Sequence, residues 1–131
     1  MKEIIFLKLE EVIAIHHDQI KRYGGSHGIR DLNLLISAIS RPQASFAGED
    51  LYSDLFDKAA AFIHSLILNH PFLDGNKRTA IVSGARFLYV NCYLFNAGNS
   101  ELVVAALKIE SKKWDISKIS SWLKKNSKKL I

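Results

Sequence analysis

Two segments with helical spacing of apolar residues, 54–69 and 76–91, are separated by a short interruption that begins at His70-Pro71. Proline disfavours helical geometry in the residue before it, so the first segment should end at Asn69 and leave the His70 imidazole accessible. The pattern predicts two consecutive helices joined by a tight loop. Their predicted inward-facing residues are Ala59, Phe62, Ile63, Leu66 and Ile67, then Ile81, Ala85, Leu88 and Tyr89. The small residues Ala80, Gly84 and Ala85 suit a central helix that its neighbours approach closely.

Four further helices are predicted from the same periodicity and from start and stop signals. The first ends at Gly24-Gly25, the second runs from the N-cap Asp31 to just before Pro42, the fifth opens at Ser100 and the sixth opens at Asp115. Their predicted inward-facing residues are, in order, Leu9, Val12, Ile13, His16 and Ile20; Leu32, Leu35, Ile36 and Ile39; Leu102, Val103, Ala106 and Leu107; and Ile116, Ile119, Trp122 and Leu123. Residues 42–53 lack helical spacing, which indicates a loop or a short hairpin. We therefore expect an all-α fold of about six helices.

The composition fits one compact domain spanning residues 1–131, because 48% of the 131 residues are hydrophobic. No apolar run reaches the roughly 18 residues of a membrane span. The segment from Met1 to Leu7 is too short for a secretory signal and carries an acid, Glu3, too early. Cys92 is the sole cysteine, so no internal disulfide can form. We expect a cytoplasmic protein without a membrane partner.

Residues 108–131 carry eight lysines against Glu110 and Asp115, a net charge of +6 in a chain whose total is +5. A basic C-terminus of this kind can attract nucleic acid or an acidic protein. The alternative, which we favour, is a solvated helix face followed by a frayed basic tail at about residues 124–131. We do not expect a nucleic-acid partner.

The interruption between the two helices contains groups suited to catalysis. A neutral imidazole at His70 can take the proton of a hydroxyl and so activate it as a nucleophile. Asp74 can hold Mg²⁺, which typically binds one or two protein carboxylates and completes its shell with phosphate oxygens and water. Each residue also has a structural interpretation. A histidine can cap the carbonyls at a helix end, and a carboxylate is favourable near a helix N-terminus.

Four residues after Asp74 are candidates for binding an anion. Gly75 lets a phosphate approach the backbone, and Asn76 opens a helix whose N–H groups can bind that phosphate. Lys77 and Arg78 lie at the helix end where cations are disfavoured, so they call for a compensating anion. The structural alternatives are a turn glycine, an asparagine that caps the helix, and solubilising charges. As a set, His70, Asp74 and these four residues favour phosphoryl-type transfer.

The stretch His70-Pro71-Phe72-Leu73-Asp74-Gly75-Asn76-Lys77-Arg78 resembles the signature of the Fic/Doc superfamily, closest to its death-on-curing (Doc) toxins. Gly28-Ile29-Arg30-Asp31, the segment from Ser37 to Pro42 and Asp57-Lys58-Ala59-Ala60-Ala61 extend the resemblance to roughly residues 1–125. It implies an α-helical domain with ATP and Mg²⁺ as cofactors. His70 would be the catalytic base, Asp74 the Mg²⁺ ligand, and Asn76, Lys77 and Arg78 the phosphate ligands. Residues 43–52 would form a flap that positions the target.

Lys77 stands where most Fic enzymes have a second glycine. Members with that glycine transfer AMP, whereas Doc-type toxins with lysine are associated with transfer of a phosphate to a threonine of elongation factor Tu. We therefore favour a protein kinase over a protein adenylyltransferase. The segment from Ser45 to Glu49 has the spacing of a Fic inhibitory helix, but it falls in the flap, and we treat it as accidental. Control should come from a small antitoxin protein. A third possibility is an inactive interaction module with a basic C-terminus.

Overall fold

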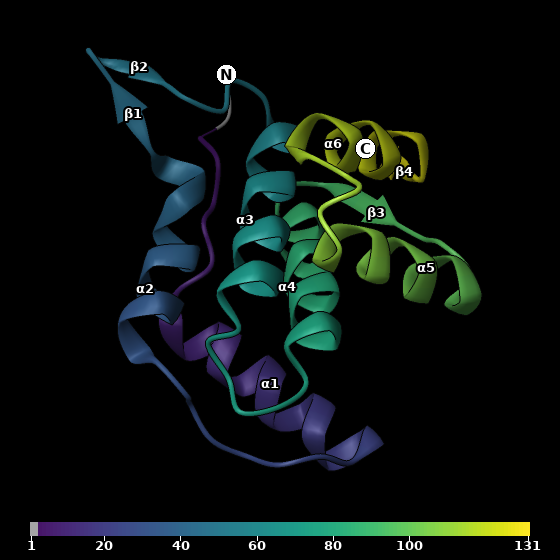
Figure 1. Ribbon diagram of the computed structural model, residues 1–131. Coiled ribbons are helices and arrows are strands. Elements are labelled where there is room, and N and C mark those ends of the chain that lie inside the picture. Colours follow the sequence, from purple (N-terminus) through teal and green to yellow (C-terminus); the bar gives the residue numbers. More distant parts are fainter. Residues whose placement is uncertain (1–2) are drawn as a thin grey trace.

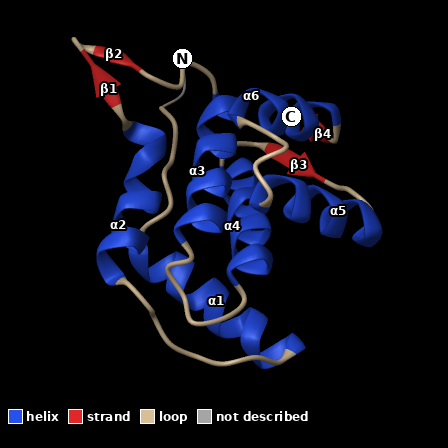
Figure 2. Cartoon of the chain, viewed as in Figure 1, coloured by secondary structure: helices blue, strands red, loops and turns tan. Residues whose placement is uncertain are grey.

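The computed structural model describes residues 3–131 and contains, within them, six α-helices and four short strands (Figures 1 and 2). The all-α prediction is confirmed, with small antiparallel strand pairs added to it. None of the helices in this part of the chain has the length and hydropathy of a membrane span. The elements are α1 (Leu9–Tyr23), α2 (Leu32–Ser40), a 3-10 turn η1 (Arg41–Gln43), β1 (Ser45–Phe46), β2 (Glu49–Asp50), α3 (Leu55–Asn69), α4 (Asn76–Val90), β3 (Tyr93–Phe95), α5 (Asn99–Glu110), α6 (Ile116–Lys125) and β4 (Ser127–Lys129).

Helices α3 and α4 form an antiparallel pair at the centre, and the other helices pack around them (Figure 1). Helix α3 begins close to its predicted start, and Asp54 is its N-cap, with a carboxylate that accepts a hydrogen bond from the Asp57 N–H. It is buried along nearly its whole length, which explains its run of three alanines at 59–61. The buried Gly84 lets α4 approach α3 closely, because a Cβ at this position would lie 2.3 Å from Ile63 Cδ1.

The β1–β2 hairpin occupies the segment in which we expected a loop or short hairpin, and it projects from the body of the protein (Figure 2). Its base is fixed by two cations. The buried Lys58 ammonium contacts the Asp50 carboxylate and the Tyr52 carbonyl, and the Arg41 guanidinium donates to the Tyr52 hydroxyl. Ser45 to Glu49 is therefore hairpin and not helix.

Several apolar residues that we predicted to face inward are exposed, which is a correction to the sequence analysis. They are Leu32 and Ile36 on α2, Tyr89 on α4, and Val103 and Leu107 on α5. Helix α2 packs on α3 through Leu35 and Ala38, and α5 packs inward through Ala105, Ala106 and Ile109. Helix α5 also begins one residue earlier than predicted, at Asn99. Apolar periodicity alone does not say which of two apolar stripes on a helix meets the core.

The C-terminus is ordered, so the prediction of a frayed tail at residues 124–131 is wrong. Lys124 and Lys125 end α6, and Ser127–Lys129 form β4, which pairs with β3 over three residue pairs. The Leu130 N–H also donates to the Cys92 carbonyl. The side chains of Lys128 and Lys129 are exposed, so the backbone of this segment pairs with β3 while the charges stay in water.

Candidate active site

The loop between α3 and α4 turns sharply at His70, which adopts the left-handed conformation (φ 46°). Pro71 and Phe72 are buried and anchor the loop, as expected, while the His70 side chain is 47% exposed. The Arg30 guanidinium donates to the carbonyls of Asn69 and His70 at 2.8 and 2.6 Å. These bonds satisfy the last carbonyl of α3 and the carbonyl of its C-cap, His70, without using the imidazole. His70 thus stays accessible, as base chemistry requires.

The loop is also held by the segment that follows α1. Backbone N–H groups of Arg30 and Asp31 donate to the Pro71 carbonyl, and Leu73 donates to the Gly28 carbonyl. From α1 itself, the buried His16 ring stacks on Phe72 with centroids 3.8 Å apart, and its Nε2 donates to the Asp74 carbonyl at 2.8 Å. Burial lowers the pKa of His16, which favours the neutral ring. Helical periodicity predicts an inward-facing His16 but gives no sign of this contact.

Asp74 is ordered by backbone donors. Its carboxylate oxygens accept the Gly75 N–H at 2.8 Å and the Ser26 N–H at 3.1 Å, and these two bonds lower the pKa of the carboxyl from its ordinary value of 3.8. Gly25 makes this approach possible, because a Cβ there would lie 2.6 Å from Asp74 Oδ2. The carboxylate is exposed and ionised at neutral pH. Its remaining lone pairs fit a Mg²⁺ ligand.

The N-terminus of α4 has no side-chain cap. Its N-cap is Gly75, at φ 73°, and not Asn76. The Asn76 carboxamide instead bonds to both backbone groups of Phe72, so its interpretation as a helix cap is wrong. The first-turn N–H groups are therefore available to an anion. This arrangement fits the predicted phosphate site at Gly75 and Asn76.

The two cations of the first turn have protein partners. The Arg78 guanidinium donates to the Gly24 carbonyl at 2.9 Å and lies 5.6 Å from the centre of the Tyr23 ring. The Lys77 ammonium lies 3.2 Å from Glu110 Oε2, and the same oxygen lies 4.0 Å from His70 Nε2. Arg78 thus faces α1 and Lys77 faces α5. We missed Glu110 because it lies 33 residues after Lys77 and belongs to no local motif.

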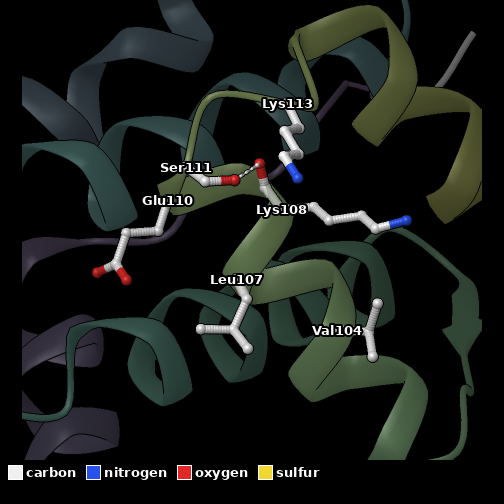
Figure 3. Close-up of a pocket in the computed structure, with 6 residues that line it drawn as sticks. All are labelled: Val104, Leu107, Lys108, Glu110, Ser111 and Lys113. Carbon is white, nitrogen blue, oxygen red and sulfur yellow. Dashed lines mark hydrogen bonds between the residues drawn. The ribbon is translucent and has the colours of Figure 1, made fainter.

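Beside Glu110 lies a pocket of about 420 Å³ lined by α5 and the turn after it (Figure 3). Val104 and Leu107 form its apolar part, and Lys108 and Lys113 supply positive charge. Figure 3 shows the Glu110 carboxylate pointing away from both of these lysines. Glu110 thus lines this pocket and also contacts Lys77 and His70.

Comparison with known proteins places these features in one family. The family model described as "Fic/DOC family" matches residues 6–88. A Mycolicibacterium smegmatis protein named "Toxin Doc" is 49% identical over 69 residues, covering 53% of each chain. An Escherichia phage P1 protein named "Protein kinase doc" is 42% identical over 82 residues, covering 63% of this chain and 64% of the relative. The alignments thus span between half and two thirds of these relatives.

Proposed function

The chain belongs to the Fic/DOC family, and from this we propose that it is a Doc-like toxin that transfers a phosphate from ATP to a protein hydroxyl. The observation that carries the proposal is the arrangement at the α3–α4 loop. The exposed His70 imidazole and the Lys77 ammonium both lie within 4.0 Å of the same Glu110 oxygen. The same loop carries the ionised Asp74 carboxylate and leads into a helix N-terminus that has no side-chain cap. The name of one relative, "Protein kinase doc", supports a kinase.

Each residue would have one task in this reaction. His70 would accept the proton of the target hydroxyl. Asp74 would hold Mg²⁺, which supplies charge neutralisation to the phosphates when bound. Gly75, whose own N–H is bonded to Asp74, would let a phosphate approach the backbone closely, Asn76 would present its backbone N–H to a phosphate oxygen, and Lys77 and Arg78 would add positive charge. The loop network described above would keep these groups in register before substrate arrives.

The proposed target is a threonine of a translation factor such as elongation factor Tu, and the proposed control is a small antitoxin protein. Both follow from the Doc resemblance, and the names of the two relatives support it. The experiment incubates the protein with elongation factor Tu and Mg·ATP and measures the mass of the factor. A gain of one phosphate is the expected result. No gain in the wild-type reaction, or the same gain with His70→Ala, would contradict the proposal.

The second candidate is a protein adenylyltransferase, which would use the same base and the same helix N-terminus. It is favoured by the family match, because the model covers Fic as well as Doc proteins. ATP labelled on the α- or the γ-phosphate distinguishes the two reactions directly. Label from the α-phosphate on the target would support adenylylation, and label from the γ-phosphate would support the kinase.

A further inference from the structure

Glu110, the last residue of α5, lies close to both Lys77 and His70 of the proposed site. Its oxygens lie 3.2 and 3.4 Å from Lys77 Nζ, and Oε2 lies 4.0 Å from His70 Nε2. The other nearby carboxylate, Asp74, is bonded to the N–H groups of Ser26 and Gly75. Within residues 3–131, Glu110 is therefore the carboxylate placed to act on both the base and the lysine.

The Lys77–Glu110 pair compensates two unfavourable placements. A cation in the first turn of α4 and an anion in the last turn of α5 each oppose the dipole of their own helix. The side chains of both residues are partly exposed, at 42% for Lys77 and 33% for Glu110. Ion pairs at such positions are weak, so a phosphate that offers Lys77 a stronger partner can replace the carboxylate.

We propose that Glu110 is a positioning residue that exchanges partners, pairing with Lys77 before nucleotide binds and stabilising His70 afterwards. This inference rests on the proposed function. In the reaction, His70 takes the proton of the target hydroxyl while the hydroxyl oxygen bonds to the terminal phosphorus of ATP. The bond from that phosphorus to its bridging oxygen breaks, and ADP leaves. The imidazolium formed on His70 then lies beside the Glu110 carboxylate, which no longer has Lys77 as its partner.

The exchange has a consequence for binding that does not depend on activity. Glu110→Gln removes the carboxylate that competes for Lys77, so a non-hydrolysable ATP analogue with Mg²⁺ should bind about two- to five-fold tighter in calorimetric titrations. In a Lys77→Met background the same substitution should change affinity little. Glu101→Gln, a charge change at the other end of α5, is the matched control and should leave affinity unchanged. An equal effect of Glu110→Gln in both backgrounds, or no effect in either, would overturn the proposal.

The second consequence is kinetic. Glu110→Gln should lower kcat for phosphate transfer on the order of tenfold while leaving KM for the protein target unchanged. Glu110→Asp, which keeps the charge, should retain more of kcat than Glu110→Gln. An unchanged kcat in Glu110→Gln would overturn the role at His70. If the wild-type protein transfers no phosphate at all, the proposed function fails, and the calorimetric cycle still decides whether Glu110 and Lys77 exchange.

Discussion

The carboxamide of Asn76 bonds to both backbone groups of Phe72: Oδ1 accepts the Phe72 N–H at 2.9 Å and Nδ2 donates to the Phe72 carbonyl at 3.0 Å. The bonds close the loop on itself immediately before α4. They leave the first-turn N–H groups of α4 without a side-chain cap, since the residue that could have capped them is turned backwards. Asn76 therefore closes the loop and does not cap the helix.

Asn76→Asp should keep the bond from the Phe72 N–H and lose the bond to its carbonyl, whereas Asn76→Ala loses both. We expect losses of about 1 and about 2 kcal/mol in the free energy of unfolding, measured in urea. Transfer activity should fall further than stability, because the N-terminus of α4 is no longer held in register with the loop. Asn99→Ala, at the exposed start of α5, is the control. If Asn76→Ala were as stable as wild type, the Asn76–Phe72 hydrogen bonds would not stabilise the loop.

Asp74→Asn retains an oxygen that can accept one of the two backbone N–H groups, so the fold should persist. The variant removes the negative charge, and we expect it to need roughly tenfold more Mg²⁺ for half-maximal transfer. The measurement is the transfer rate over a Mg²⁺ titration, with the unfolding midpoint as a check on folding. A Mg²⁺ curve that matches wild type would show that Asp74 does not hold the metal.

Gly84→Ala should destabilise the protein although alanine favours helices. The added Cβ would lie 2.3 Å from Ile63 Cδ1, and Ile63 is buried. Overpacking of this kind typically costs about 1–3 kcal/mol, against a gain of about 1 kcal/mol in helix propensity. Adding Ile63→Ala removes both carbons that the new Cβ would approach, Cδ1 at 2.3 Å and Cγ1 at 2.5 Å, so the double variant should be more stable than the sum of the two single losses predicts. Thermal unfolding of wild type, the two single variants and the double variant tests this. If the two losses in stability simply add, the clash between the new Cβ and Ile63 is not the cause.

The stability of the protein should fall as the pH drops below about 6.5, in part because of His64. Burial and the charge of Arg41 lower the pKa of His64 from 6.5, and its Nδ1 accepts a hydrogen bond from Arg41 at 3.1 Å. The unfolded chain takes up the proton first, so the stability that neutral His64 contributes above pH 6.5 is lost as pH falls through the folded pKa. The pKa of His16 is also lowered by burial, so protonation of His16 likewise lowers stability as the pH falls. His64→Gln should therefore reduce, and not abolish, the slope of unfolding free energy against pH between about pH 7.5 and 5. An unchanged slope would show that His64 does not contribute to the pH dependence.

Deletion of residues 127–131 should lower the free energy of unfolding by about 2 kcal/mol or more, because it removes the pairing of β4 with β3. Replacing Lys128 and Lys129 by serine keeps the backbone and removes the charges, so this variant should stay close to wild type. Chemical denaturation compares the three proteins. If the deletion is harmless and the serine variant is not, the segment contributes through charge and not through pairing.

The local chemistry of the chain was enough to predict the helices that carry the site. Asp31 acts as an N-cap as predicted, α3 and α6 begin directly after Asp54 and Asp115, Gly24 ends α1, and α3 stops before Pro71. The predicted accessibility of His70 follows from the same proline and is confirmed. These features depend on neighbours a few residues away, and sequence spacing reports such neighbours directly.

Contacts between distant segments were not predictable in this way. Glu110 reaches Lys77 only because α5 packs beside α4, and His16 reaches the Asp74 carbonyl only because α1 crosses beneath the loop (Figure 1). The pairing of β4 with β3 was missed because a lysine-rich terminus shows no apolar alternation. The roles of His70, Asp74, Gly75, Asn76, Lys77 and Arg78 in a reaction stay predictions.

The backbone bonds between residues 28–31 and 71–73 have a practical consequence for protein engineering. A designer who transplants only the α3–α4 hairpin into another scaffold would leave behind Gly28, the Arg30 side chain and the backbone donors that shape its connecting loop. The portable unit is therefore discontinuous in sequence. A chimera that carries residues 9–31, with His16, along with 55–90 should preserve the loop, and one that carries the hairpin alone should not.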